Sequence, residues 1–142
     1  MIEAYKKMMK NYAKFDGRTS RRDFWFAFLA YWLMSMIIAI PQYIVSFIAG
    51  FNAGYNGTTE VAANGALGIL SIIFGIIVAI FELAHLVPLL AMEVRRLHDI
   101  NKSGWFILLG LLSICCGIGA IILIVFYCMP SVDEGNNYGE KV

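Results

Sequence analysis

Charged side chains are scarce in this chain. Asp, Glu, Lys and Arg make up only 15% of its 142 residues, whereas soluble domains carry about a quarter. No charge at all occurs from Phe24 to Ala49. Apolar residues reach 60% and the mean hydropathy is +0.71. These features exclude an ordinary soluble domain and favour a membrane protein, and a net charge of +1 gives no reason to expect a nucleic-acid partner.

Cysteine and histidine are also few. The three cysteines, Cys115, Cys116 and Cys128, lie within one apolar run, and the two histidines stand apart at His85 and His98. This pattern matches neither a disulfide framework nor a zinc site. We therefore predict no metal, no cofactor and no catalytic residue.

Three long apolar runs dominate the chain: residues 24–49, 67–92 and 105–129. Each is long enough to cross the hydrocarbon core as a helix, which needs about 20 residues. Thr19 or Ser20 can cap the first of these helices, and Ser20 with Asp23 resembles a capping box. The fold we predict is a single all-α membrane domain over residues 1–142, with three transmembrane helices and a polar tail at 130–142.

Residues 1–15 show apolar side chains at helical spacing, with lysines on the opposite face. Such a helix is typical of the membrane interface, where lysines meet anionic headgroups. The alternative is a helix that packs on the protein's own loops. We predict an N-terminal amphipathic interfacial helix.

Basic residues are distributed unevenly along the chain. Ten of the eleven Lys and Arg residues fall in the first 22 residues or between Arg95 and Lys102, and residues 50–66 have none. The positive-inside rule then places both basic segments in the cytoplasm. We predict a multi-pass protein of the bacterial plasma (inner) membrane with a cytoplasmic N-terminus, and three spans would put the C-terminus outside.

Small residues recur at helical spacing in the second and third runs. They are Ser71, Gly75 and Ala79, and then Gly110, Ser113, Gly117 and Ala120. Such stripes allow helices to approach closely in lipid. We expect these two runs to form a close-packed hairpin.

The basic segments together form a candidate anion site. A guanidinium group binds two phosphate oxygens at once through two parallel hydrogen bonds. A serine at the start of a helix offers its hydroxyl group, and the first turn of the helix offers free backbone N–H groups. The predicted residues for a lipid headgroup or phosphate are Arg18, Arg21, Arg22, Arg95, Arg96, Lys102 and Ser103. The alternative is that the arginines serve topology and pair with Asp23, Glu93 and Asp99.

Glu82 and His85 form a second candidate site. They are three residues apart on one helix face, and Glu82 falls about 15 Å inside the second run. Ionisable residues at such depth are costly and often functional. A proton or cation relay is one interpretation, and a carboxyl that is hydrogen-bonded inside the helix bundle is the other.

His98-Asp99 and Gly104-Trp105 flank the loop between the second and third runs. Neighbouring side chains on a helix point apart, and no nucleophile accompanies His98 and Asp99, so a catalytic dyad is disfavoured. We expect Asp99 to cap the following turn or to pair with Arg95 or Arg96, and these four residues to form a structural hinge.

Several short motifs are similar to one known family. They are Phe15-x-Gly17-Arg18-x-Ser20-Arg21-x-x-Phe24-Trp25, then Arg95-Arg96-Leu97-His98-Asp99 with Ser103-Gly104-Trp105, and then Gly135-Asn136-x-Tyr138-Gly139. The chain resembles the bacterial YhaH/YhaI-like inner-membrane proteins, which form domain-of-unknown-function family 805. This resemblance implies a small multi-span inner-membrane protein and implies no activity. Lys102 stands where these proteins often have Arg.

Two functions follow as hypotheses. The favoured one is a non-enzymatic membrane protein whose cytoplasmic arginine cluster binds anionic lipid headgroups or a protein partner. The alternative is a small transporter or channel component that uses Glu82 and His85. Because three helices enclose little space, the alternative requires self-association. The partners we expect for the chain are membrane lipids, and another copy of the chain or another membrane protein. Whether the chain is an enzyme is left open by the sequence, and a non-enzymatic role is favoured.

Overall fold

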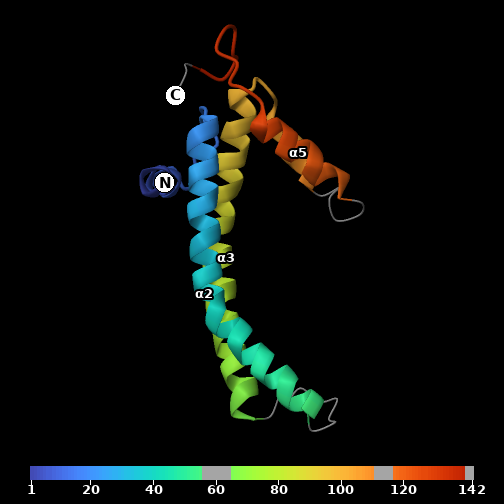
Figure 1. Ribbon diagram of the computed structural model, residues 1–142. Coiled ribbons are helices and arrows are strands. Elements are labelled where there is room, and N and C mark those ends of the chain that lie inside the picture. Colours follow the sequence, from blue (N-terminus) through green and yellow to red (C-terminus); the bar gives the residue numbers. More distant parts are fainter. Residues whose placement is uncertain (56–64, 111–116, 140–142) are drawn as a thin grey trace. The chain divides into compact units, whose positions relative to one another are not determined.

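The structure is a computed structural model that describes residues 1–55, 65–110 and 117–139. Within that part of the chain every regular element is a helix (Figure 1). These are α1 (Ile2–Lys10), α2 (Arg21–Tyr55), α3 (Ala66–Asp99), the 3₁₀-helix η1 (Gly104–Leu108) and α5 (Ile118–Cys128). The predicted all-α class is confirmed.

The contacts divide the chain into two units. The first comprises Met1–Tyr31 with Leu86–Val142, and the second comprises Trp32–His85. Helices α2 and α3 each contribute to both units. The motifs singled out in the sequence all fall in the first unit, whereas Glu82 and His85 belong to the second.

Helices α2 and α3 are longer than the apolar runs that predicted them. The hydroxyl of Ser20 accepts a hydrogen bond from the N–H of Asp23 at 3.3 Å, which confirms the predicted cap and starts α2 three residues early. At the other end, α3 continues through the charged residues Arg95 to Asp99 because these side chains find partners within the protein. Pro41 and Pro88 lie inside the two helices, as membrane helices tolerate.

Large apolar side chains on α2 and α3 are exposed. Phe47 is 75% exposed and Leu83 is 67% exposed. Both helices are long and apolar enough to cross a membrane, and the core helix of a soluble protein would bury such side chains. The exposure therefore supports lipid, and not a protein interior, as the surroundings of these two helices.

The third apolar run differs from the predicted helix over 105–129. Residues 104–108 form a 3₁₀-helix, and α5 begins only after Gly117, whose φ of 70° is left-handed. With eleven residues, α5 is about 16 Å long, roughly half of a 30 Å hydrocarbon core. Residues 111–116 lie outside the described part of the chain.

The C-terminal tail returns to the N-terminal arm. The N–H of Val132 donates to the carbonyl of Asp99 at 3.0 Å, and Arg18 Nη1 donates to the carbonyl of Gly139 at 3.2 Å. Segments in contact lie on one side of any bilayer that α2 and α3 cross. These contacts favour a C-terminus on the same side as the N-terminus, whereas three complete spans would place it opposite, so the side of the C-terminus stays a prediction.

Helix α1 is shorter than the predicted 1–15 segment. It ends at Lys10 because Asn11 folds back, with its side-chain Nδ2 on the carbonyl of Lys7 at 2.9 Å. Its buried face, Ala4 and Met8, joins the core cluster of the first unit, which is formed mainly by helical residues and not by the loops that the alternative interpretation named. Exposed Ile2 leaves an apolar edge, so the interfacial position stays a prediction.

The small-residue stripe of α3 has neighbours on α2 within the second unit. Ser71 Oγ accepts a hydrogen bond from Gln42 Nε2 of α2 at 3.1 Å, and Gly75 also has Gln42 as its neighbour. Gln42 therefore gives the stripe a polar partner on α2, and the predicted hairpin between the second and third runs stays a prediction. In the third run, a Cβ on Gly110 would lie 3.7 Å from Leu123 Cδ1 of α5, and Ser113 lies outside the described residues.

Candidate functional site

Asp99 is the centre of a buried ion-pair network in the first unit. Its side chain is 2% exposed, and Arg18 Nη2 lies 2.8 Å from its Oδ1. Arg96 Nη1 and the hydroxyl of Ser131 donate to the other oxygen, Oδ2. The predicted pairing of Asp99 with a neighbouring arginine is thus confirmed for Arg96, and Arg18 joins it from 81 residues away.

The remaining donors of Arg18 go to the C-terminal tail. Its Nη2 also donates to the carbonyl of Val132 at 3.0 Å and to Asp133 Oδ1 at 3.2 Å. With the Gly139 bond described above, the guanidinium group faces protein oxygens on several sides. Arg18 therefore works as a link between the N-terminal arm, the end of α3 and the tail.

Arg96 links the end of α3 to the end of α5. Its Nε and Nη2 donate to the carbonyl of Tyr127 at 3.2 and 3.1 Å, and Nη2 also reaches the carbonyl of Met129. The last carbonyl groups of a helix have no hydrogen-bond donor within the helix, and lipid tails offer none. The Arg96 guanidinium supplies the hydrogen bonds that these carbonyls need. Arg96 is fully buried, and its donors are used inside the protein.

The third sequence motif completes the network. Asn136 Nδ2 donates to the carbonyls of His98 and Asp99 at 3.0 and 3.3 Å. The ring of Tyr138 stacks on His98 with centroids 3.9 Å apart. Three motifs that are far apart in sequence therefore meet at one place, and the tail segment 131–139 is held there by specific bonds.

Gly104 and Trp105 take different positions at this site. A Cβ on Gly104 would lie 2.7 Å from Val94 Cγ1, so only glycine fits against α3. Trp105 is 78% exposed. At Gly104 the chain passes close to α3, the helix that precedes it, and this close approach requires glycine. It gives a physical reason for the hinge that was predicted at Gly104.

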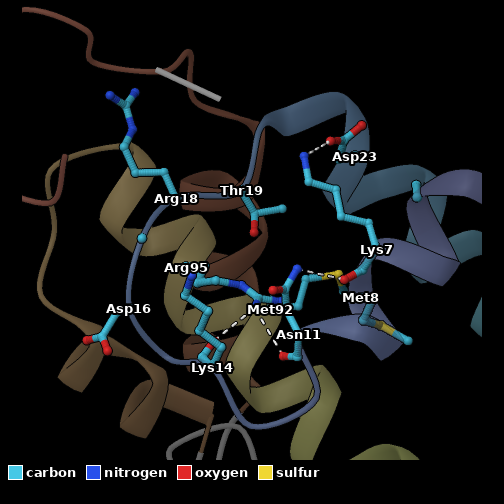
Figure 2. A pocket seen from close by; sticks show the side chains of 12 residues that line it. Lys7, Met8, Asn11, Lys14, Asp16, Arg18, Thr19, Asp23, Met92 and Arg95 are labelled. Carbon is cyan, nitrogen blue, oxygen red and sulfur yellow. Dashed lines mark hydrogen bonds and ion pairs between the residues drawn. The ribbon is translucent and has the colours of Figure 1, made fainter. Parts of the chain in front are cut away.

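A pocket of about 220 Å³ lies between α1, the loop after it and α3 (Figure 2). It is lined by Ala4, Lys7, Met8, Asn11, Lys14, Asp16, Gly17, Arg18, Thr19, Asp23, Met92 and Arg95. Lys7 is held by Asp23 at 2.9 Å. In Figure 2 the Arg18 guanidinium points away from Lys7 and Arg95, which agrees with its bonds to Asp99 and the tail.

Arg95 is the unusual cation of this pocket. Its side chain is buried, and Nη1 donates to the carbonyls of Asn11 and Lys14 at 3.1 and 2.8 Å (Figure 2). Among the described residues no carboxylate forms an ion pair with it. A buried charge with no opposite partner is costly, so an anion in this pocket would be stabilised.

The other predicted anion-binding residues lie elsewhere. Arg21 and Arg22 are exposed, and Arg21 donates to the carbonyl of Cys128 at 3.3 Å. Lys102 is exposed as well, and the hydroxyl of Ser103 caps η1 by accepting from the N–H of Trp105. The structure therefore brings only Arg95 and the backbone end of Arg18 to the pocket.

Of the twelve residues that line the pocket, only Arg18 and Arg95 were predicted for the anion site, and Lys7, Lys14 and Thr19 are among those that sequence reasoning missed. The two lysines belong to the basic face that was assigned to the membrane interface as a whole. The fold selects them because the chain turns back after Lys10, and the N–H of Thr19 bonds to the carbonyl of Arg95 at 3.1 Å. No local pattern in the sequence predicts that turn.

Glu82 and His85 both have protein partners in the second unit. Ser35 Oγ of α2 donates to Glu82 Oε1 at 2.5 Å, and His85 Nδ1 lies 2.8 Å from the carbonyl of Phe81. This arrangement matches the hydrogen-bonded interpretation of Glu82. Within the described residues no group of three or more His, Cys, Asp or Glu side chains is placed to hold a metal ion.

Comparison with known proteins relates the chain to a family of membrane proteins. Residues 12–140 match a family model described as "Protein of unknown function (DUF805)". The chain is 33% identical over 138 residues to the inner membrane protein YhaH of Escherichia coli strain K12, covering 97% of this chain and 94% of that one. It is 28% identical to the inner membrane protein YhaI of the same strain, over 97% and 93%.

No solved structure matches the chain. The family match covers both the arm that carries Arg18 and the tail that carries Asn136, so the segments of the buried network fall within it. The chain belongs to the DUF805 family and is a helical membrane protein.

Proposed function

We propose that this chain is a non-enzymatic, multi-pass protein of the bacterial plasma membrane that binds the anionic headgroup of a phospholipid. The pocket beneath α1 is the binding site, and it lies on the cytoplasmic side with the N-terminus. The buried Arg95 carries this proposal, because its guanidinium faces a pocket and meets no carboxylate among the described residues.

The charge of the pocket supports an anion. Lys7, Lys14 and Arg95 bring three cationic groups to it, and the acidic lining residues are Asp16 and Asp23. Asp23 is already paired with Lys7. Arg95 binds phosphate oxygens well because its planar group presents several donors, and Lys14 adds a point charge.

The position of the pocket supports a membrane lipid as the source of the anion. Helix α1 covers the pocket, and the same helix exposes Ile2 and carries Lys6 and Lys10 on its outer face. Such a helix is suited to the interface between headgroups and acyl chains. The N-terminal arm and the basic loop share one side of the protein, which fits the positive-inside rule.

Native mass spectrometry of the full chain tests the proposal. The protein is purified in detergent and offered equimolar phosphatidylglycerol and phosphatidylcholine with identical acyl chains. We expect retained phosphatidylglycerol to exceed phosphatidylcholine, and Arg95→Gln to lower that preference about tenfold, because a hydrogen bond to a charged group contributes about 1.5–3 kcal/mol. Inorganic phosphate serves as the competitor that separates a free anion from a lipid.

A matched control uses two lysines of the same chain. Lys14→Gln removes a charge that lines the pocket, and Lys6→Gln removes an exposed charge outside it. We expect the first substitution to weaken the preference and the second to leave it unchanged. Equal retention of the two lipids by the native protein, or equal effects of the two lysine substitutions, would overturn the proposal.

The transporter alternative has one observation in its favour. Glu82 is held by Ser35 inside the second unit, and a carboxyl at membrane depth is a common element of proton pathways. The same hydrogen bond is also expected if Glu82 only stabilises the packing of α2 against α3, so we place this function second. Proton flux in proteoliposomes that is lost in Glu82→Gln would support it, and flux that is absent or unchanged would remove it.

A further inference from the structure

A second pocket, of about 270 Å³, lies between α2, α3 and α5 within the first unit. It has no residue in common with the pocket beneath α1. The side chains that line it are almost all apolar, namely Phe24, Trp25, Phe28, Ala120, Leu123 and Ile124, with Glu93 and Tyr127 as the exceptions. A ligand pocket of this type is mostly apolar with a few polar groups that fix orientation.

Two polar side chains, Glu93 and Tyr127, interact with each other in this pocket. The hydroxyl of Tyr127 is buried, in a residue that is 7% exposed, and no hydrogen bond of ordinary length and angle satisfies it in the described chain. Glu93 is close enough to interact with that hydroxyl. None of the ion pairs within the described residues involves Glu93, so no cation of that part of the chain neutralises its carboxyl group.

Aromatic rings form one wall of the same pocket. The rings of Phe24 and Trp25 meet edge to face with centroids 5.4 Å apart, and Trp25 meets Phe28 in the same way at 6.1 Å. Faces of aromatic rings attract cations. A carboxylate beside aromatic rings in an apolar pocket is therefore complementary to a positively charged group on an apolar body.

We propose that this pocket binds a lipophilic amine. The ammonium group donates hydrogen bonds to the Glu93 carboxylate and to the oxygen of the Tyr127 hydroxyl, and the apolar body lies against Phe24, Trp25 and Leu123. The volume is slightly below the range of about 300–1,000 Å³ typical of drug-sized ligands. The occupant is therefore a small amine and not a two-chain phospholipid.

Three probes of equal length separate the chemistry of the head from that of the body: octylamine, octanol and octanoate. The full chain carries Trp32→Phe and Trp105→Phe, so that Trp25 in the pocket is the sole tryptophan, and its fluorescence is titrated in detergent. Both replaced tryptophans are exposed. We expect octylamine to bind at least about tenfold more tightly than octanol, since a hydrogen bond to a charged group contributes about that factor, and octanoate to bind most weakly.

Substitutions in the same micelles remove the effect of probe partitioning. Glu93→Gln is expected to reduce octylamine binding to the level of octanol, and Glu3→Gln, an exposed carboxyl of α1, to change nothing. Tyr127→Phe keeps the ring and is expected to weaken octylamine binding several-fold. The comparison of the three probes on the protein with Glu93 intact requires no pocket variant to fold. Octanol binding as tightly as octylamine, or Glu93→Gln binding octylamine unchanged, would overturn the proposal.

Discussion

Arg18 and Asp99 form an ion pair between side chains that are 1% and 2% exposed, across 81 residues of chain. Neither charge could be buried alone, since an isolated ion in a protein interior costs several kcal/mol. Arg96 and Ser131 complete the coordination of the same carboxylate. The pair therefore fixes the N-terminal arm, the end of α3 and the tail relative to one another.

We expect Asp99→Asn to destabilise the protein by about 3–5 kcal/mol, because it leaves Arg18 and Arg96 buried without a carboxylate. Asp133→Asn is the matched control, since Asp133 also pairs with Arg18 but is 39% exposed, and we expect a loss of about 0–1 kcal/mol. Urea unfolding in detergent, followed by circular dichroism, measures both. Similar losses for the two variants would contradict a central role for Asp99.

Gly104→Ala is expected to cost about 1–3 kcal/mol, the usual range for overpacking a well-packed site, because the new methyl group would meet Val94 Cγ1 at 2.7 Å. The double variant with Val94→Ala should recover part of that loss. Gly54→Ala is the control, because nothing lies within 4 Å of its site in α2. Thermal unfolding midpoints measure all three, and a Gly104→Ala protein as stable as Gly54→Ala would show that the loop can move away.

The tail and the N-terminal arm should be labelled from the same side of the membrane. Single cysteines at Asn137 and Arg22, in a chain whose native cysteines are replaced by serine, are treated in oriented vesicles with an impermeant maleimide. We expect both positions to react from the same side, because the tail bonds to Asp99 and Arg18. Labelling from opposite sides would mean that the third apolar run crosses the membrane as a complete span.

Ser35→Ala should destabilise the helix pair of the second unit by about 0.6 kcal/mol and at most about 1.7 kcal/mol, the measured range for hydrogen bonds between membrane helices. The reason is the bond from its hydroxyl to Glu82. A double-mutant cycle with Glu82→Leu isolates the interaction, using steric trapping or denaturant titration as the readout. A coupling energy near zero would mean that the two side chains do not share a hydrogen bond in the membrane.

Local features of the molecule could be predicted from the sequence because they depend on neighbouring residues. The cap at Ser20 follows from a serine placed three residues before Asp23, and the pairing of Arg96 with Asp99 follows from helical spacing. The candidate anion site was predicted only in part. Among the residues predicted for the anion site, Arg95 lines the pocket with its side chain. Lys7 and Lys14 also line it but were not predicted for it, because the turn that brings α1 and the following loop together is not indicated by any periodicity.

The sequence by itself determined the solvent and the type of element: runs without charge require lipid, and in lipid the backbone must satisfy its own hydrogen bonds as helix. It did not determine which basic side chains form ion pairs inside the protein and which face a pocket. That was decided by tertiary contacts, because the partner of a buried charge is chosen by proximity in space, and Asp99 takes Arg18 and Arg96 while Arg95 is left with main-chain carbonyls. The position of the tail beside the N-terminal arm was decided in the same way, by bonds to residues far away in the chain.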